Sequence, residues 1–237
     1  MIYLSEIKTT SNTLPKKYPF TIDAIKKGIN LEFNSFVTFL VGENGSGKST
    51  ILEAIAKSIG FNPAGGSTSN RYENKETESD LSSYLKLIWQ IKTNSGFFLR
   101  AESFYNFASY VDELRDDPLD GHNAYAPYGG KSLHEQSHGE SFFSLFKNRF
   151  KKGVFILDEP EAALSPQRLL SLLSILKNLE NEGATQFIIA THSPILLSYP
   201  NAMIYNLDDG LKPIKYKETE HFKATKSFLE NPELYHK

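Results

Sequence analysis

The chain has 237 residues, contains no cysteine and carries a formal net charge of -2 at pH 7. The lack of cysteine excludes disulfides and cysteine-ligated zinc, and the balance of charges gives no overall basic field for nucleic acid. A hydrophobic content of 40% is enough for a full core, so a single α/β domain over 1–237 is expected. There is no uninterrupted apolar run of about 18 residues and no basic leader, which favours a cytoplasmic location without a membrane segment.

The first third of the chain contains short segments with the patterns of strands. Strands are predicted at 2–9 and, in two parts, across 28–41. The polar, glycine-rich segment 61–80 predicts a mobile surface loop. Strands at 85–92 and 97–101 are separated by a short turn, so they are expected to form a hairpin.

The rest of the chain alternates helical and strand patterns. Apolar residues at helical spacing predict helices at 103–114, from about 140 to 153, at 167–179 and, shortly before the C-terminus, at 225–229. Apolar runs predict buried strands at 154–157 and 185–190, and a closing pair of strands at 202–207 and 212–216. The alternation is typical of an α/β fold.

The motif around which the chain is organised is a Walker A phosphate-binding loop. Gly42 to Ser49 reads GENGSGKS and fits G-x-x-x-x-G-K-[ST] at every fixed position, between an apolar strand at 37–41 and a helical pattern. Such a loop points backbone N–H groups at phosphate, while Lys48 reaches the β- and γ-phosphates and Ser49 binds Mg²⁺. The predicted nucleotide-binding residues are Gly42, Glu43, Asn44, Gly45, Ser46, Gly47, Lys48, Ser49 and Thr50.

Four further motifs follow in a fixed order. They are SHGES at 137–141, DEP at 158–160 after an apolar strand, LSP at 164–166, and THSP at 191–194 after the next strand. With the phosphate loop, this order resembles the ABC-type ATPases, and among them the SMC-like and OLD-like heads that are often labelled AAA-like. The resemblance implies a P-loop fold in which helices flank a mixed sheet, with a small antiparallel β lobe and a helical signature region at about 102–152.

The resemblance also implies the cofactors and the catalytic roles. ATP and Mg²⁺ are expected, with Lys48 on the phosphates and Asp158 holding Mg²⁺ through water. Glu159 is implied as the general base and His192 as the residue that senses the γ-phosphate. Glu102 follows a predicted strand where the family usually has a glutamine, and it is expected on the metal or its water. A surface ion pair with Arg100 is the alternative for Glu102.

An ATP-dependent homodimer is the implied assembly. Ser137, Gly139 and Glu140 correspond to the signature loop, which acts on ATP bound to the other subunit, and Ser165 lies in the segment that crosses the dimer interface. ATP would close the dimer and hydrolysis would open it. The chain departs from the usual signature at 136 and 138, where glutamine and histidine replace leucine and glycine.

The output of such an ATPase is open to several readings. A compact head acting with a protein partner or nucleic acid, in DNA maintenance or defence, is the main hypothesis; the interval from Lys48 to Asp158 is too short for a long coiled-coil arm. The basic cluster Lys147, Arg149, Lys151 and Lys152 could contact nucleic acid, but a charged helix end near its negative dipole is the commoner explanation. The alternative is the ATPase subunit of a membrane transporter.

Two smaller points concern single segments. Residues 134–138 read HEQSH and fit the zinc-hydrolase motif H-E-x-x-H, with Glu159 or Glu161 as a third ligand, but that motif requires the middle of a helix and glycines flank it here. Tyr18 or Phe20 could stack on adenine, and a core aromatic next to a proline explains either residue at least as well.

Overall fold

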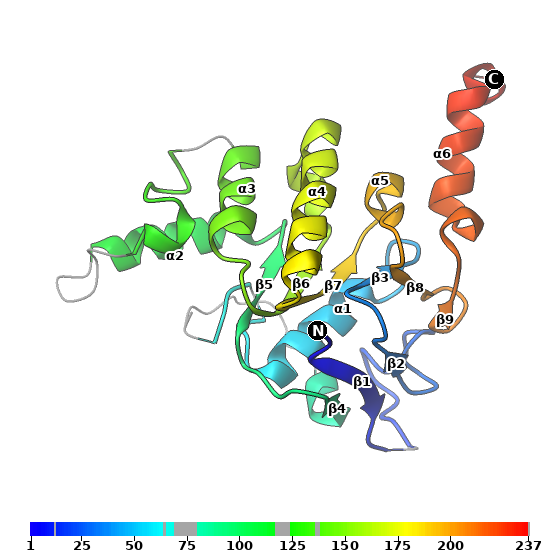
Figure 1. Ribbon diagram of the computed structural model, residues 1–237. Helices are drawn as coiled ribbons and strands as arrows, with labels where there is room; N and C mark the ends of the chain where they lie inside the picture. The colour runs from blue at the N-terminus through cyan, green and yellow to red at the C-terminus, as the bar shows by residue number, and fades with distance from the viewer. Residues whose placement is uncertain (12, 64, 69–79, 117–123, 136–137, 237) are drawn as a thin grey trace.

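The computed structural model describes residues 1–11, 13–63, 65–68, 80–116, 124–135 and 138–236, which form two β-sheets with helices between and above them (Figure 1). The strands are β1 (Leu4–Thr9), β2 (Asn30–Glu32), β3 (Val37–Val41), β4 (Leu85–Trp89), β5 (Gly96–Arg100), β6 (Gly153–Asp158), β7 (Thr185–Ala190), β8 (Met203–Asn206) and β9 (Lys212–Pro213). The helices are α1 (Lys48–Ile59), α2 (Phe104–Arg115), α3 (His138–Asn148), α4 (Pro166–Glu182), α5 (Pro194–Leu197) and α6 (Glu220–Glu230).

The larger sheet determines where the functional motifs meet. Its strand order is β5-β6-β7-β3-β8-β9, and all neighbours are parallel except β8 and β9. Every residue of β3, β6 and β7 is buried, as expected for parallel strands that are covered on both faces. Because these strands are parallel and adjacent, the segments that follow them emerge at one edge of the sheet.

Helix α1 lies between the two sheets. It contacts β4 on one side and β6 and β7 on the other, and its residues Ile51, Leu52 and Ile55 are fully buried. The smaller sheet, in the antiparallel order β2-β1-β4, covers the far side of this helix. The helix that begins at the phosphate loop is therefore enclosed by the core.

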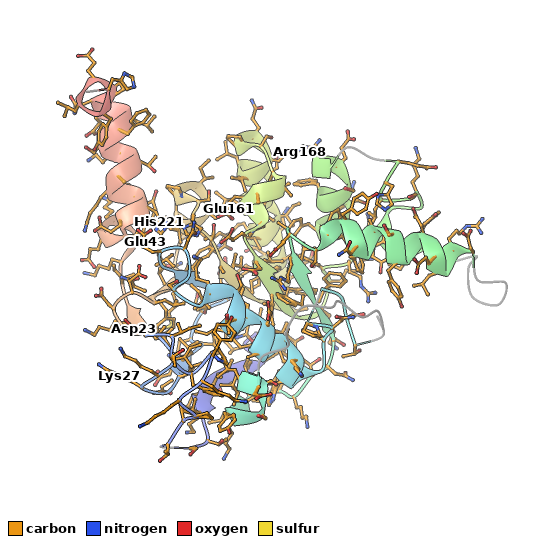
Figure 2. The ribbon with its side chains drawn as sticks, turned by 180° about the vertical axis from the view of Figure 1, so that it is seen from behind. Asp23, Lys27, Glu43, Glu161, Arg168 and His221 are labelled. Atoms are coloured by element: carbon orange, nitrogen blue, oxygen red, sulfur yellow. The ribbon has the colours of Figure 1, made fainter. Side chains whose placement is uncertain are left out.

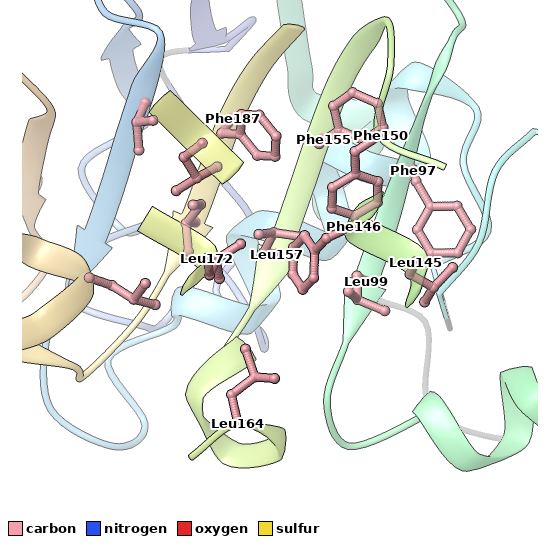
Figure 3. Packing of buried hydrophobic residues seen from close by; sticks show 14 of the residues in the cluster. Phe97, Leu99, Leu145, Phe146, Phe150, Phe155, Leu157, Leu164, Leu172 and Phe187 are labelled. Carbon is pink, nitrogen blue, oxygen red and sulfur yellow. The ribbon is translucent and has the colours of Figure 1, made fainter. Parts of the chain in front are cut away.

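Helices α3 and α4 cover the opposite face of the larger sheet (Figure 1). Aromatic rings fill the space beneath them: the centroids of Phe150 and Phe155 are 4.4 Å apart and those of Phe155 and Phe187 are 5.4 Å apart (Figure 3). Rings of this size bury much apolar area, so this cluster contributes strongly to stability.

The predicted hairpin of β4 and β5 is wrong. Strand β4 pairs with β1 in the small sheet, whereas β5 runs parallel to β6 in the large sheet, with Phe98 beside Ile156. Phe97, Phe98 and Leu99 are all buried, so both faces of β5 need cover, which a solvent-facing hairpin does not supply. A Cβ at Gly96 would lie 1.8 Å from the carbonyl oxygen of Val154, so glycine is required where the two strands approach.

A buried amide helps to join the two sheets. Gln186 of β7 is fully buried; its Oε1 accepts hydrogen bonds from the backbone N–H groups of Tyr3 and Leu4, and its Nε2 donates to the carbonyl of Leu4. The small sheet is thereby anchored to the strand that precedes His192.

Several boundaries differ from the predictions. The expected mobile loop at 61–80 is wrong for its first part, because Phe61 is buried and Gly66 pairs with Phe98; residues 69–79 lie outside the described residues. Helix α3 ends at Asn148 rather than near 153, and the terminal helix α6 begins five residues before its predicted start. Thr219 caps α6 by accepting a hydrogen bond from the N–H of Phe222, which explains the earlier start.

Candidate nucleotide-binding site

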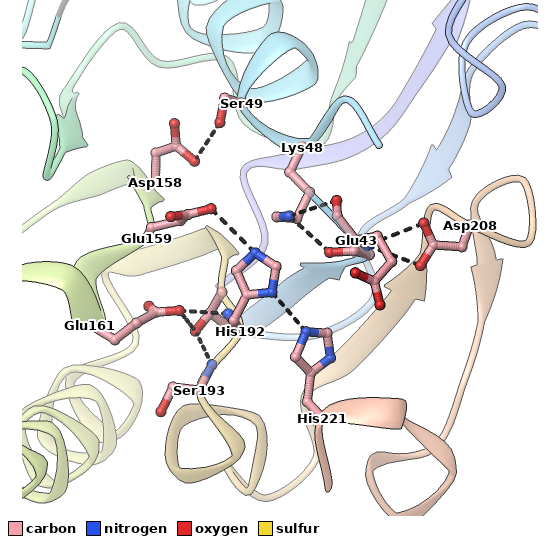
Figure 4. A network of polar contacts seen from close by, with 12 residues as sticks. Glu43, Lys48, Ser49, Asp158, Glu159, Glu161, His192, Ser193, Asp208 and His221 are labelled. Atoms are coloured by element: carbon pink, nitrogen blue, oxygen red, sulfur yellow. Dashed lines mark hydrogen bonds and ion pairs between the residues drawn. The ribbon is translucent and has the colours of Figure 1, made fainter. Parts of the chain in front are cut away.

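The phosphate loop lies between β3 and α1, as predicted. Gly47 has φ 100°, a left-handed conformation that favours glycine, at the residue that caps α1. The buried Nζ of Lys48 donates to the carbonyls of Gly42 (2.8 Å) and Glu43 (3.2 Å), and burial lowers the pKa of Lys48. The lysine is thus held inside the loop, directed at its backbone (Figure 4).

Asp158 is next to Ser49 at the end of β6. The Ser49 hydroxyl donates to Asp158 Oδ1 at 3.1 Å, which brings the two predicted magnesium ligands together. Burial raises the pKa of Asp158 to about 6, although Arg100 and the Ser49 hydrogen bond both lower it. Asp158 and Ser49, with Glu102 and Glu159, line a hollow of about 350 Å³.

Glu159 has an unusual backbone conformation. Its φ of 49° is left-handed, which is rare for a residue other than glycine and is often found at functional sites. The conformation starts the sharp turn at the end of β6, and the backbone N–H of Glu159 still donates to Ala190 of β7. Glu159 Oε1 lies 3.3 Å from His192 Nε2 (Figure 4).

The loop that carries His192 is fixed by Glu161. Glu161 Oε1 accepts hydrogen bonds from the Thr191 hydroxyl at 2.8 Å and from the backbone N–H of His192. On its other side, His192 Nδ1 lies 2.8 Å from Nε2 of His221, a residue of α6. Figure 2 shows that His221 lies close to Glu43 of the phosphate loop, so α6 reaches the site.

The other predicted residues occupy different surroundings. Glu102 forms an ion pair with Arg100 at 3.2 Å, which was the alternative interpretation of this residue, and 75% of its side chain is exposed. Glu102 also lines the hollow that contains Ser49 and Asp158. Ser165 caps α4, and its Oγ accepts from the N–H of Arg168. Glu140 lies in the first turn of α3, 3.9 Å from Arg168. Gly139 belongs to α3, and Ser137 lies outside the described residues.

Of the two aromatics expected near adenine, only Tyr18 is accessible. Its side chain is 63% exposed and its hydroxyl lies 3.3 Å from Thr50 Oγ1, at the start of α1. Phe20 is buried against Tyr84, so the core reading is correct for this residue.

The H-E-x-x-H segment is not in the middle of a helix, so the zinc-hydrolase interpretation is wrong. His134 lies in a turn, where its Nε2 contacts the Ser109 hydroxyl, and α3 begins only at His138. The two histidines therefore do not share one face of a continuous helix. Over the described ranges, no group of three or more His, Cys, Asp or Glu side chains is placed to hold a metal by itself.

The residues present fit a triphosphate with Mg²⁺. Within the described chain, Ser46 Oγ is buried and makes no hydrogen bond, so this donor lacks an acceptor. The buried His192 Nε2 also makes no hydrogen bond, although the Glu159 carboxylate lies 3.3 Å from it. Phosphate oxygens are acceptors of this kind. Mg²⁺ is usually held by one or two protein groups together with phosphate oxygens and water, which matches Ser49 and Asp158.

Comparisons with known proteins agree with this geometry. Residues 20–119 match a family described as "AAA domain", and residues 141–198 match one described as "AAA domain, putative AbiEii toxin, Type IV TA system". A "Putative ABC transporter ATP-binding protein" of Methanothermobacter thermautotrophicus is 28% identical over 211 residues, which cover 81% of this chain and 72% of the relative.

Solved structures resemble the whole chain. The CbiO1 subunit of the CbiONQ ABC transporter complex of Clostridium perfringens superimposes with a TM-score of 0.52 at 18% identity, covering 100% of this chain and 98% of that one. A bacterial ABC transporter cassette solved as a dimer gives 0.50 at 17% identity, covering 92% and 100%. The chain has the ABC-type ATPase fold. The predicted mixed sheet, small antiparallel lobe and helical region are therefore confirmed.

Within this ABC-type fold, four residues shape the nucleotide site in roles that the sequence motifs did not assign to them. Arg100 ion-pairs with Glu53 at 2.8 Å and lies 3.6 Å from Asp158 Oδ2, and Asp208 accepts the backbone N–H of Glu43. The other two, described above, are Glu161 and His221. Of the four, only Arg100 could have been suspected from the sequence, as a charged residue at the end of an apolar strand.

None of the helices in the described ranges is long and apolar enough to cross a membrane.

Proposed function

We propose that this protein binds and hydrolyses Mg-ATP and that ATP joins two copies of it head to head. The observation that carries the proposal is the convergence at one edge of the sheet: Ser49 bonds to Asp158, and Glu159 faces His192 from the neighbouring strand. Phosphoryl transfer depends mainly on positioning and on charge stabilisation, and these residue types supply both.

Each residue has a role that follows from its place. The N–H groups of the phosphate loop and the start of α1 would bind phosphate oxygens, and Lys48 would exchange its loop carbonyls for them. Ser49 and Asp158 would hold Mg²⁺, which neutralises charge on the phosphates when bound. Glu159 would accept the proton of the attacking water, while the Nε2–H of His192 would donate to the γ-phosphate.

The exposure of the γ-phosphate side supports a dimer. The side chains of Glu159 and His192 are 41% and 31% exposed, whereas Asp158 is 7% exposed. Phosphoryl transfer works best when water is excluded and donors surround the γ-phosphate. A second copy, presenting Gly139 and Glu140 of α3 and the Ser165 segment, would close this side.

The output proposed for the dimer is action on a protein partner or nucleic acid, in DNA maintenance or defence. The matched family named for a toxin of a type IV toxin–antitoxin system supports the defence reading. Arg149, Lys151 and Lys152 line a hollow of about 330 Å³ with Ser67 and Asn94, which gives a local cationic surface for phosphate groups. Lys147 lines a separate hollow beside Arg168.

A second candidate is the ATPase subunit of a transporter. It is favoured by the relatives, which include a hemin import ATP-binding protein of Bartonella henselae at 25% identity. Purification of the tagged protein from its own cells separates the candidates: a co-purifying integral membrane protein supports the transporter, and soluble partners or DNA support the stand-alone head.

The experiment that tests the proposal is the solution mass of the Glu159→Gln variant, measured by light scattering on a sizing column with and without Mg-ATP. The mass should double only with Mg-ATP, because ATP closes the dimer and this variant lacks the base that leads to reopening. The double variant Lys48→Ala, Glu159→Gln should stay monomeric, since its phosphate binding is lost. A Glu159→Gln protein that binds ATP but stays monomeric contradicts the proposal.

A further inference from the structure

A residue outside every recognised motif contacts the proposed γ-phosphate sensor. His221 lies in the first turn of α6, and its Nε2 is 2.8 Å from Nδ1 of His192, with ring centroids 4.9 Å apart. Figure 4 shows His192 between two partners, Glu159 on its Nε2 side and His221 on its Nδ1 side. The two ring nitrogens of His192 therefore meet groups of different chemistry.

The partners decide where the proton of His192 lies. A carboxylate only accepts hydrogen bonds, so Glu159 Oε1 at 3.3 Å favours a proton on His192 Nε2. A neutral His192 then has a lone pair on Nδ1, and a hydrogen bond of 2.8 Å requires the Nε2–H of His221 to donate to it. If His192 is doubly protonated, its Nδ1–H donates to His221 instead. In both cases the proton on Nε2 is retained.

His221 is held in the neutral form that this arrangement uses. Burial lowers the pKa of His221, and the nearby His192 and Lys48 lower it further, while Glu43 and Asp208 oppose them. Neutral imidazole has one N–H and one acceptor nitrogen, so His221 can donate to His192 without placing a second positive charge beside Lys48.

The contact is also one of the few anchors of α6. In the described chain no residue of α6 is fully buried, and the helix stands away from the sheets (Figure 1). It is attached at its first turn, where His221 meets His192 and Phe222 packs on Tyr216 with ring centroids 4.7 Å apart. A displacement of α6 therefore removes the partner of His192.

We propose that His221 is a positioning residue that fixes the tautomer and the orientation of His192, so that His192 Nε2–H faces the γ-phosphate only while α6 is seated. The inference rests on the proposed ATPase function and adds a dependence on the C-terminal helix. His192 Nε2 lies 3.3 Å from Glu159 Oε1 but makes no hydrogen bond within the described residues, so a phosphate oxygen that enters beside Glu159 can accept its proton.

Two substitutions separate hydrogen bonding from packing. His221→Phe keeps a planar ring of similar size but removes the hydrogen bond. His221→Gln places an amide N–H near the position of the imidazole Nε2 and keeps the donor. Lys226→Ala is the matched control, because Lys226 is an exposed residue of the same helix that only ion-pairs with Glu230. All three proteins, with the wild type, are assayed for Mg-ATP hydrolysis and for ADP binding.

The expected result is a fall in kcat of about tenfold for His221→Phe, the size expected when one orienting hydrogen bond is lost, with ADP affinity within about twofold of wild type. ADP lacks the γ-phosphate, so its binding does not use His192. His221→Gln should restore kcat to within about threefold, and Lys226→Ala should match the wild type. Equal kcat for His221→Phe and wild type, or equal losses for the Phe and Gln variants, overturns the proposal.

A measurement without turnover separates this inference from the function on which it rests. The ¹⁵N chemical shifts of the imidazole of His192 report which nitrogen carries the proton. In the wild type Nε2 should be protonated and Nδ1 bare, or both protonated, and His221→Phe should move the shifts toward an averaged mixture of tautomers. Unchanged shifts overturn the proposal. A wild type that does not hydrolyse ATP overturns the proposed function instead, while the shifts still test His221.

Discussion

The two sides of the candidate site are built from different parts of the molecule. On the phosphate side, Lys48 and Asp158 are buried at the start of α1 and at the end of β6. On the γ-phosphate side, Glu159 and His192 are partly exposed and lie on turns. His192 is held by Glu161 from a short turn and by His221 from a helix with no buried residue.

This difference separates what the core fixes from what an external partner can change. The phosphate side cannot move without disturbing packing of the parallel strands, since protein interiors are closely packed. The γ-phosphate side depends on a few polar contacts, each of about 1 kcal/mol. Regulation by dimerisation or by α6 is therefore expected to act on hydrolysis more than on nucleotide binding.

The largest effect is expected from Asp158→Asn on the phosphate side. Loss of the carboxylate should reduce Mg-dependent hydrolysis by at least about a hundredfold, because the metal loses its protein anion. The same change should stabilise the nucleotide-free protein at pH 8, by up to about 3 kcal/mol, since the pKa of about 6 means that burial disfavours the charged form. Urea unfolding and a phosphate-release assay measure the two effects.

The pH dependence of this gain has a definite sign. The folded-state pKa of Asp158 lies above its usual value of 3.8, so the wild type loses stability relative to Asp158→Asn as pH rises from about 4 to 6. Below this window the two proteins should be equally stable with respect to this group. Asp209→Asn, a change at an exposed carboxylate, serves as the control, because it removes no buried charge. A gain that is independent of pH contradicts the assignment to ionisation.

The next effect concerns the attachment of the small sheet beneath α1. Gln186→Leu should lower the free energy of unfolding by about 2 to 4 kcal/mol, because two backbone N–H groups and one carbonyl lose their buried partner. Urea unfolding measures the loss, and Gln167→Leu on the exposed start of α4 is the matched control. Equal stability of the two variants would mean that the Gln186 amide adds nothing to the strand pairing and apolar packing that hold β1.

The sequence was sufficient where the information is local. The strand at 37–41, the loop and α1 follow from one motif with its flanks, and the ends of β6 and β7 follow from apolar runs that stop at Asp158 and Ala190. These predictions succeeded because the pattern and the packing require the same residues.

The failures arose where long-range packing decides. Strands β4 and β5 are neighbours in the sequence, but they belong to different sheets, because the continuous apolar run of β5 needs cover on both faces. His221 and Glu161 both contact the segment at His192, which is distant from them in the sequence. No sequence motif links either residue to His192, so these contacts could not be predicted. The early start of α6 had a signal, since Thr219 is a good N-cap residue that the apolar pattern alone did not include.

The smallest effect tests whether Ser165 is more than a helix cap. Its hydroxyl accepts the N–H of Arg168, so Ser165→Ala should cost about 1 kcal/mol of stability. Ser165→Asp keeps an acceptor at the cap and should stay within about 0.5 kcal/mol of the wild type, but it adds a negative charge. If Ser165 faces a second copy in the closed dimer, the Asp change, combined with Glu159→Gln, should weaken ATP-dependent dimerisation more than the Ala change does. If both combined variants dimerise as Glu159→Gln does, Ser165 serves only α4, and the γ-phosphate side is closed by other residues.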